Sequence, residues 1–156
     1  PVACLLGTEN EGFAYLTANL AQERLSIAIN SQAAAAAALS WTVAMVSEKD
    51  AGQDARFTLA DCAAEVAAGQ ALIDQSLAAL VDERLTGADA AVAKLFCTEL
   101  QGRVVDKCMR LWEPGTVMRT DSLIGNAYLD GRVSRIYGGS SEIMKVIIGQ
   151  QLGAAP

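Results

Sequence analysis

The sequence predicts an all-α protein, an up-and-down bundle of about four main helices plus one short helix. Apolar residues recur at spacings of three, four and seven over long stretches without proline. Polar links that contain glycine separate these stretches, and no segment shows the alternation of a half-buried strand. Residues 1–156 are therefore expected to form a single helical domain. Because the chain begins at Pro1 without a methionine, we expect it to be a piece of a longer protein.

The first helix is predicted to span residues 8–47, with Thr8 as its cap. Apolar residues form a main line along it and a second line on the opposite side. The main line comprises Phe13, Leu16, Leu20, Ile27, Ala34, Ala38, Trp41 and Met45, and the second comprises Leu25, Ile29, Leu39 and Val43. A helix that is apolar on two faces is buried on two faces, so a subunit or domain partner is expected.

Four further helices are predicted at residues 54–85, 88–111, 122–129 and 140–152. Thr86 and Asp89 resemble a capping box at the start of the helix 88–111. Pro114 and Gly115 are expected to end that helix. Residues 25–47 carry no charge and are long enough to span a membrane, but their many alanines and polar residues favour a buried helix instead.

Composition excludes several functions. The net charge is -6 and the basic residues are scattered, which argues against a nucleic-acid partner. Histidine is absent, so acid–base chemistry must use a carboxylate, lysine, tyrosine or cysteine. The four cysteines lack metal-ligand spacing, so no metal site is expected. They are interpreted as buried apolar residues in a reducing compartment.

Glu23 is the most unusual carboxylate, because Leu16, Leu20 and Ile27 flank it at the edge of the main apolar line. Burial would raise its pKa and suit it to act as a general base near neutral pH. Alternatively, Glu23 pairs with Arg24 or with an arginine of another helix, or extends to solvent. Periodicity does not choose between these interpretations.

The stretch from Tyr137 to Glu142, YGGSSE, combines a double glycine with the start of a helix. Gly138 and Gly139 permit backbone conformations that a Cβ would exclude. Ser140 or Ser141 can cap the helix, and Glu142 suits the positive end of its dipole. The free N–H groups of such a turn can bind an oxyanion or phosphate, although a plain loop has the same pattern.

Other polar residues are ambiguous. Arg135 could bind an anion or be solvated, and Tyr137 could line a pocket or belong to the core. Lys94 and Glu99 are interpreted as a solvated face or as inter-helix pairing. Gln53 follows the first polar link, where a cofactor could lie.

Four segments together resemble the C-terminal helical domain of acyl-CoA dehydrogenases. They are LLGTENEGF (residues 5–13), LAQERL (20–25), AYLDGRV (127–133) and RIYGGSSEIMK (135–145). The resemblance covers nearly the whole chain and is greatest to the long-chain and isovaleryl branch. It implies FAD as cofactor, an acyl-CoA substrate, and α,β-dehydrogenation of the thioester. It also implies electron-transfer flavoprotein or a similar acceptor as partner, and a homodimer, homotetramer or heteromer in the bacterial cytoplasm or the mitochondrial matrix.

The resemblance also implies residue roles. Many members place the catalytic carboxylate directly after the tyrosine, where this chain has Gly138. In the long-chain and isovaleryl branch the base is the glutamate before arginine in the first helix, which is Glu23 here. The N–H of Gly138 would then polarise the thioester carbonyl. Arg24 and Tyr137 are expected at the substrate, and Gly139, Ser140, Glu142 and Gln53 at the flavin.

Two segments depart from the family pattern. After the first helix the family usually has R-x-x-F-G followed by glutamine, whereas SEKDAG (residues 47–52) precedes Gln53 here. The Q-x-x-G-G turn is altered to RLWEPG (residues 110–115). Both changes affect expected cofactor contacts, and indicate either a loop missing from this piece of chain or a degenerate, FAD-deficient assembly subunit that pairs with a complete partner.

Overall fold

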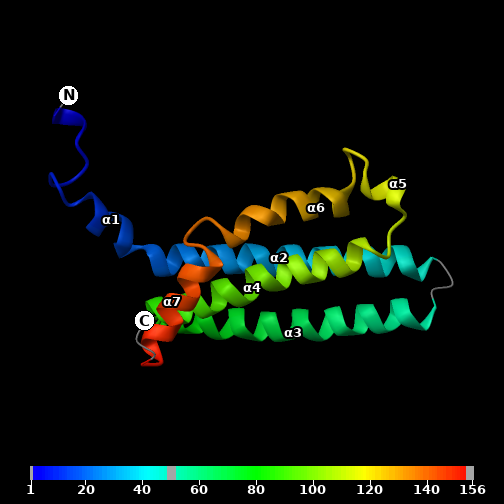
Figure 1. The fold of residues 1–156 in the computed structure, drawn as a ribbon. Helices are drawn as coiled ribbons and strands as arrows, with labels where there is room; N and C mark the ends of the chain where they lie inside the picture. The colour runs from blue at the N-terminus through cyan, green and yellow to red at the C-terminus, as the bar shows by residue number, and fades with distance from the viewer. Residues whose placement is uncertain (1, 49–51, 154–156) are drawn as a thin grey trace.

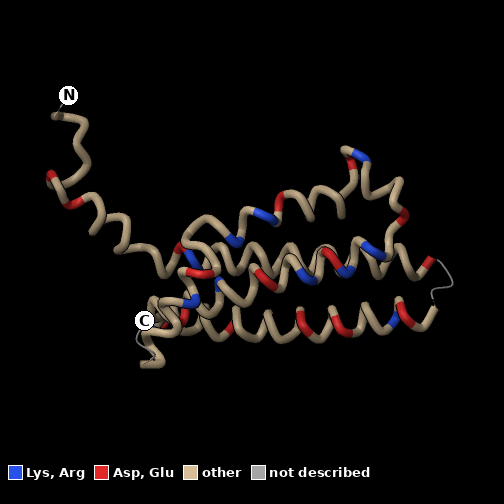
Figure 2. The backbone as a smooth tube through the Cα atoms, in the orientation of Figure 1, with Lys and Arg blue, Asp and Glu red and all other residues tan. Residues whose placement is uncertain are grey.

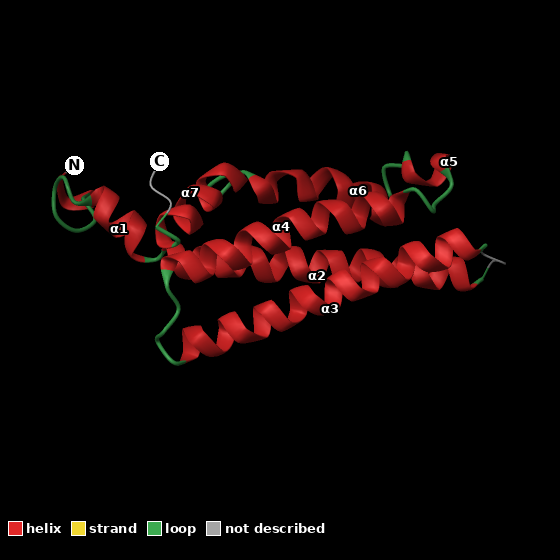
Figure 3. Cartoon of the chain, turned by 60° about the horizontal axis from the view of Figure 1, so that its bottom comes forward, coloured by secondary structure: helices red, strands yellow, loops and turns green. Residues whose placement is uncertain are grey.

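The computed structural model describes residues 2–48 and 52–153, and these contain helices and turns but no strand (Figure 3). The helices are α1 (Gly12–Ala18), α2 (Leu20–Ser47), α3 (Gln53–Val81), α4 (Gly87–Met109), α5 (Pro114–Val117), α6 (Leu123–Gly131) and α7 (Ser141–Gln151). Two 3-10 segments, η1 (Val2–Cys4) and η2 (Arg132–Arg135), complete the order. The predicted all-α class is confirmed.

The long helices run up and down beside one another, as predicted (Figure 1). Helix α3 returns along α2, α4 runs back in contact with both, and α6 lies along α2 and α4. Helix α7 then crosses the end of the bundle where α2 begins and packs on α4. The first turn of α2 and the glycine turn before α7, 114 residues apart in sequence, therefore meet.

The first helix differs from its prediction, because it is two helices with a break at Asn19. Thr8 does not cap α1. Its N–H donates to the hydroxyl of Tyr15 at 2.9 Å, and Glu11 is the residue that precedes the helix. Helix α1 projects from the end of the bundle (Figure 1), and Phe13 and Leu16 are 79% and 72% exposed. Apolar periodicity continues through Asn19 and so does not detect the break.

The buried face of α2 combines parts of both predicted lines with polar residues. It comprises Arg24, Leu25, Ile27, Ala28, Ser31, Gln32, Ala35, Ala38 and Thr42. Alanine side chains let α4 approach closely, and Ala35 and Ala38 contact a core that includes Leu100, Val104 and Ile124. The hydropathy pattern misplaced this face because it counts Ser31, Gln32 and Thr42 as solvent-facing.

The Gln32 side chain is paired across the helix interface through its Nε2, which donates to the Val66 carbonyl at 2.7 Å, whereas its buried Oε1 has no hydrogen-bond partner among the described residues. The lack of a side chain at Gly69 lets the Gln32 side chain lie this close to α3. A Cβ on Gly69 would lie 2.2 Å from the Gln32 Oε1 and 2.7 Å from a methyl group of Leu100. Helices α2, α3 and α4 therefore meet closely at Gly69.

Helix ends follow local signals in most cases. The capping box of Thr86 and Asp89 at the start of α4 is confirmed, and Ser122 and Ser140 cap α6 and α7. Helix α3 ends at Val81, four residues before its prediction, and Glu83 in the link adopts a φ of 55°. Helix α4 already ends at Met109, so Pro114 begins α5 rather than ending α4.

None of the described helices has both the length and the hydropathy that crossing a membrane requires. Cys62, Cys97 and Cys108 are buried as predicted, and burial raises the pKa of Cys97 to about 12. Cys4 is exposed, so the prediction is wrong for that residue. It lies in η1, none of whose residues is buried in the described part of the chain.

Gly69→Ala is expected to lower the thermal midpoint of the full-length protein, because overpacking a closed helix interface costs about 1–3 kcal/mol. Gly149→Ala is the matched control. An added Cβ there meets nothing within 4 Å, and alanine is favoured over glycine in a helix by roughly 0.5–1 kcal/mol. Differential scanning calorimetry should show midpoint shifts of opposite sign. Equal shifts would contradict the close approach at Gly69.

Candidate functional site

The glycine turn at residues 137–140 lies between η2 and α7. Gly138 has a φ of 66° and Gly139 a φ of 104°, conformations that residues with a Cβ rarely adopt. A Cβ on Gly138 would lie 2.5 Å from Ile27 Cδ1, and one on Gly139 would lie 2.7 Å from Met144 Cε. Both glycines are thus required by backbone angle and by space.

Two cationic side chains bind the backbone carbonyl groups of this turn. The Nε of Arg24, at the start of α2, donates to the Gly138 carbonyl at 3.2 Å. The Nζ of Lys94, on α4, donates to the Gly139 carbonyl at 2.5 Å. Arg24 is 9% exposed and Lys94 is fully buried. Side chains from two helices therefore bind two successive carbonyls of the turn.

Lys94 occupies a position that disfavours its charge. Burial lowers its pKa, the nearby charge of Arg24 lowers it further, and Glu99 only partly opposes them. Of the two alternatives for Lys94, the solvated face is therefore wrong, because the side chain is fully buried. Sequence patterns did not reveal this role, because the turn that it contacts is 45 residues away.

Glu99, also on α4, links the turn to η2. Its Oε1 accepts a hydrogen bond from the Ser141 hydroxyl at 2.6 Å, and its Oε2 pairs with Arg135 at 3.3 Å. The alternative of inter-helix pairing is therefore confirmed for Glu99. Arg135 is bound to Glu99 rather than simply solvated.

Glu23 lies in the first turn of α2, next to Arg24, and its side chain reaches the glycine turn. A Cβ built on Gly138 would be 3.8 Å from Glu23 Oε1. The side chain is exposed in this chain, and no ion pair joins it to Arg24 within the described residues. The alternative of pairing with Arg24 is therefore excluded, since Arg24 is directed to Gly138.

The start of α7 is a second source of positive potential at this end of the bundle. Ser140 caps the helix by accepting the N–H of Ile143 at 3.5 Å. The exposed Glu142 carboxylate accepts a hydrogen bond from its own backbone N–H and another from Ser140, which lower its pKa. Tyr137, 44% exposed, borders the turn. Figure 2 shows acidic and basic residues close together where α2 begins and α7 crosses it.

The backbone N–H groups of Gly138, Gly139 and Ser140 donate no hydrogen bond within the described part of the chain. Free donors beside a helix N-terminus favour an anionic or strongly polarised oxygen. A carboxylate, Glu23, lies against the same turn. The arrangement can therefore hold an oxyanion while a base removes a proton nearby.

Gln53 is the one predicted site residue that the bundle separates from the others. It begins α3, at the opposite end of the 28-residue helix α2, which is about 42 Å long (Figure 1). Gln53 therefore cannot share one small contact region with Gly138 of the same chain. Residues 49–51 of the altered SEKDAG segment lie outside the described residues.

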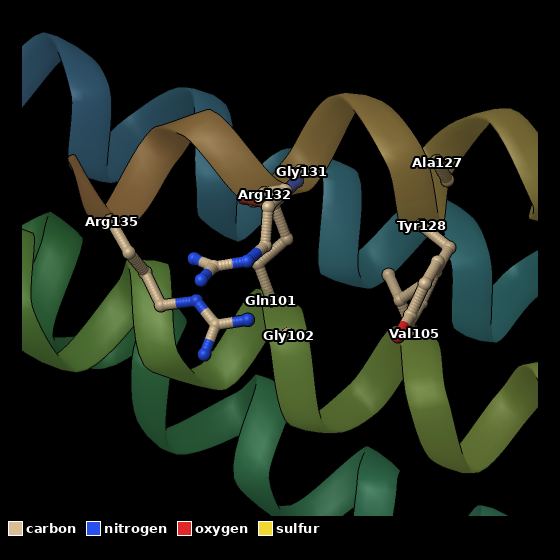
Figure 4. Close-up of a pocket in the computed structure, with 8 residues that line it drawn as sticks. All are labelled: Gln101, Gly102, Val105, Ala127, Tyr128, Gly131, Arg132 and Arg135. Atoms are coloured by element: carbon tan, nitrogen blue, oxygen red, sulfur yellow. The ribbon is translucent and has the colours of Figure 1, made fainter. Parts of the chain in front are cut away.

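A small cavity of about 100 Å³ lies apart from the turn, between α4 and the α6–η2 segment (Figure 4). Arg132 and Arg135 extend over it toward α4, and Tyr128 lies against Val105. The buried Arg135 Nε and Gln101 Oε1, a donor and an acceptor, have no hydrogen-bond partner in the part of the chain that the structure describes. Buried polar atoms of this kind commonly bind ordered water.

Comparison with known proteins agrees with the helical fold. A family model for the acyl-CoA dehydrogenase C-terminal domain matches residues 10–153. The mitochondrial long-chain specific acyl-CoA dehydrogenase of Rattus norvegicus is 35% identical over 97% of this chain and 37% of its own length. Bos taurus isobutyryl-CoA dehydrogenase is 30% identical over 97% of this chain and 38% of its own length. An acyl-CoA dehydrogenase structure from Geobacillus kaustophilus has a TM-score of 0.91 at 35% identity, covering 97% of this chain and 42% of that one.

The chain therefore belongs to the acyl-CoA dehydrogenase family. Within the family it corresponds to the C-terminal helical domain, and it spans less than half the length of these relatives. The resemblance stated from the sequence motifs is confirmed.

Gly139→Ala is expected to destabilise the turn by roughly 1–2 kcal/mol or more, because alanine at a φ of 104° is strained and its Cβ meets Met144. Gly115→Ala serves as the control, since a Cβ there meets nothing within 4 Å. Thermal unfolding of both full-length variants would measure the difference. An unchanged midpoint for Gly139→Ala would contradict the described backbone.

Proposed function

We propose that this chain is the C-terminal domain of an FAD-dependent acyl-CoA dehydrogenase that catalyses α,β-dehydrogenation of an acyl-CoA thioester. The observation that supports the proposal is the approach of Glu23 to the Gly138 turn. A base and a free backbone donor at one place match the two needs of Cα proton removal, which are proton acceptance and polarisation of the carbonyl. Family membership supplies the reaction class.

The residues at the turn fit the anionic side of a flavin dinucleotide. The unpaired N–H groups of Gly139 and Ser140 lie at the N-terminus of α7, beside two cations, and a Cβ at either glycine would obstruct this backbone. Gly139, Ser140 and Glu142 would hold this side of FAD, and Gln53 would contact FAD from another subunit. When bound, FAD supplies the acceptor for the Cβ hydride.

Residues of this chain would remove the Cα proton and bind the thioester. Glu23 would take the Cα proton onto its carboxylate. The Gly138 N–H would donate to the thioester oxygen and stabilise the negative charge that develops there. Tyr137 would border the acyl-CoA, and Arg24, whose Nε holds the Gly138 carbonyl, would fix the turn against the substrate.

The proposed function includes partners and an oligomeric assembly, which we infer from family membership. We expect acyl-CoA as substrate, electron-transfer flavoprotein or a similar protein as electron acceptor, and a homodimer, homotetramer or heteromer. Exposed apolar side chains such as Phe13, Leu16 and Val43 suit burial against other domains or subunits. The bacterial cytoplasm or the mitochondrial matrix is the proposed compartment.

A second candidate is a non-catalytic, FAD-deficient assembly subunit of a heteromeric acyl-CoA dehydrogenase. Two altered segments favour it, SEKDAG at residues 47–52 and RLWEPG at residues 110–115. The structure gives the second segment a turn after α4 and the start of α5, in place of a double-glycine turn. The intact glycine turn and Glu23 favour the first candidate.

Glu23→Gln in the full-length protein is expected to lower kcat for acyl-CoA dehydrogenation by at least about 1,000-fold, because the amide cannot accept the Cα proton. The affinity for acyl-CoA should change little, since the two side chains have the same shape. Stopped-flow reduction of the flavin and equilibrium titration with acyl-CoA would measure the two effects.

Glu83→Gln is the matched control for Glu23→Gln. Glu83 lies exposed in the link between α3 and α4, and no hydrogen bond or ion pair within the described residues joins its side chain to the glycine turn. The activity of Glu83→Gln should therefore equal that of the wild type. Full activity of Glu23→Gln would overturn the assignment of the base.

The absorption spectrum of the purified full-length protein discriminates the two candidates. The catalytic proposal expects about one flavin per chain, with its absorbance bleached by acyl-CoA under anaerobic conditions. A flavin-free protein that gains activity only when a homologous subunit is added would support the assembly subunit instead.

A further inference from the structure

Two successive carbonyls of the glycine turn are each bound by a different cation from a different helix. Arg24 of α2 holds the Gly138 carbonyl and Lys94 of α4 holds the Gly139 carbonyl. In a trans peptide the C=O and the N–H of one unit point in opposite directions. The two contacts therefore direct the N–H groups of Gly139 and Ser140 away from the Arg24 and Lys94 side chains, and these N–H groups donate no hydrogen bond within the described residues.

Helix packing alone does not account for Lys94. Its side chain is fully buried beside Arg24, a second cation, and burial is the main cause of its lowered pKa. An apolar residue of the same length would avoid that desolvation cost. Lys107, thirteen residues later on α4, is the opposite case, because its hydrogen bond to Glu65 raises its pKa and its side chain is partly exposed.

The hydrogen bond from Lys94 to the Gly139 carbonyl also affects the backbone conformation of Gly138. Both glycines have positive φ angles, and without a Cβ the turn has many accessible conformations. Arg24 fixes one peptide of the turn, and Lys94 fixes the next one. Charge-assisted hydrogen bonds to two neighbouring peptides restrict the turn to one conformation and polarise its N–H groups.

We propose that Lys94 is a positioning residue for dehydrogenation, acting with Arg24 as a clamp that orients the Gly139 and Ser140 N–H groups toward the anionic side of the cofactor and restrains the backbone next to the Gly138 N–H, which would bind the thioester oxygen. This inference rests on the proposed function and adds a residue that the sequence motifs do not mark. Lys94 touches neither reacting group and acts through the Gly139 carbonyl.

The test compares Lys94→Met with Lys107→Met in the full-length holoenzyme. Methionine keeps the length of lysine and removes its charge and donors. For Lys94→Met we expect kcat to fall about 10- to 100-fold with KM within about 3-fold, because misorientation affects the transition state more than ground-state binding. Its thermal midpoint should stay within about 4 °C of the wild type. Lys107→Met should keep its kcat and lose some thermal stability with its Glu65 pair.

Crystal structures of the same two variants supply a measurement that does not need activity. The Gly139 carbonyl should leave its wild-type orientation in Lys94→Met and keep it in Lys107→Met. If the wild-type protein proves inactive, the proposed function fails, and these structures still decide whether the clamp exists. Unchanged kcat and an unchanged turn in folded Lys94→Met would overturn the inference.

Lys94→Gln separates positioning from folding if Lys94→Met is not recovered. Glutamine retains an N–H donor without a charge, and a folded variant with reduced kcat would support the clamp. Failure of both variants to fold would overturn the inference, since Lys94 would then serve stability rather than the reaction.

Discussion

The close packing of α2 against α4 is the interaction on which the candidate site depends. Small buried residues at the interface, among them Ala28, Ala93 and Cys97, let the two helices approach. This brings Arg24 and Lys94 under the same turn, although they are 70 positions apart in the chain. Without that contact, Gly138 and Gly139 would be a flexible link before α7.

Several polar side chains inside the bundle bind specific partners on another element. Gln32 binds the Val66 carbonyl, Trp112 Nε1 donates to Thr42 at 3.0 Å, and Ser141 donates to Glu99. Each contact joins two elements and restricts how they can slide past each other. The buried polar residues therefore fix the register of the helices that carry the site.

The candidate site combines a carboxylate that is exposed in this chain with a backbone turn whose carbonyl groups are bound by two cationic side chains. Glu23 lies above the Gly138 turn, while Lys94 and Arg24 hold the carbonyl side of the same turn. Family relatives are more than twice as long as this chain, so the surface above Glu23 suits a cover from the rest of such a protein. Such a cover would exclude water and strengthen every electrostatic interaction at the turn.

The sequence by itself determined the helical class, the capping box at Thr86, the glycine turn and the family, because these depend on local spacing and short motifs. It did not determine the break at Asn19 or the buried face of α2, because hydropathy treats Gln32 and Thr42 as surface residues. Only the tertiary structure decided the position of Lys94. Its partner, the Gly139 carbonyl, belongs to a distant segment, and a lysine in a helix has the same sequence pattern whether it faces solvent or a buried turn.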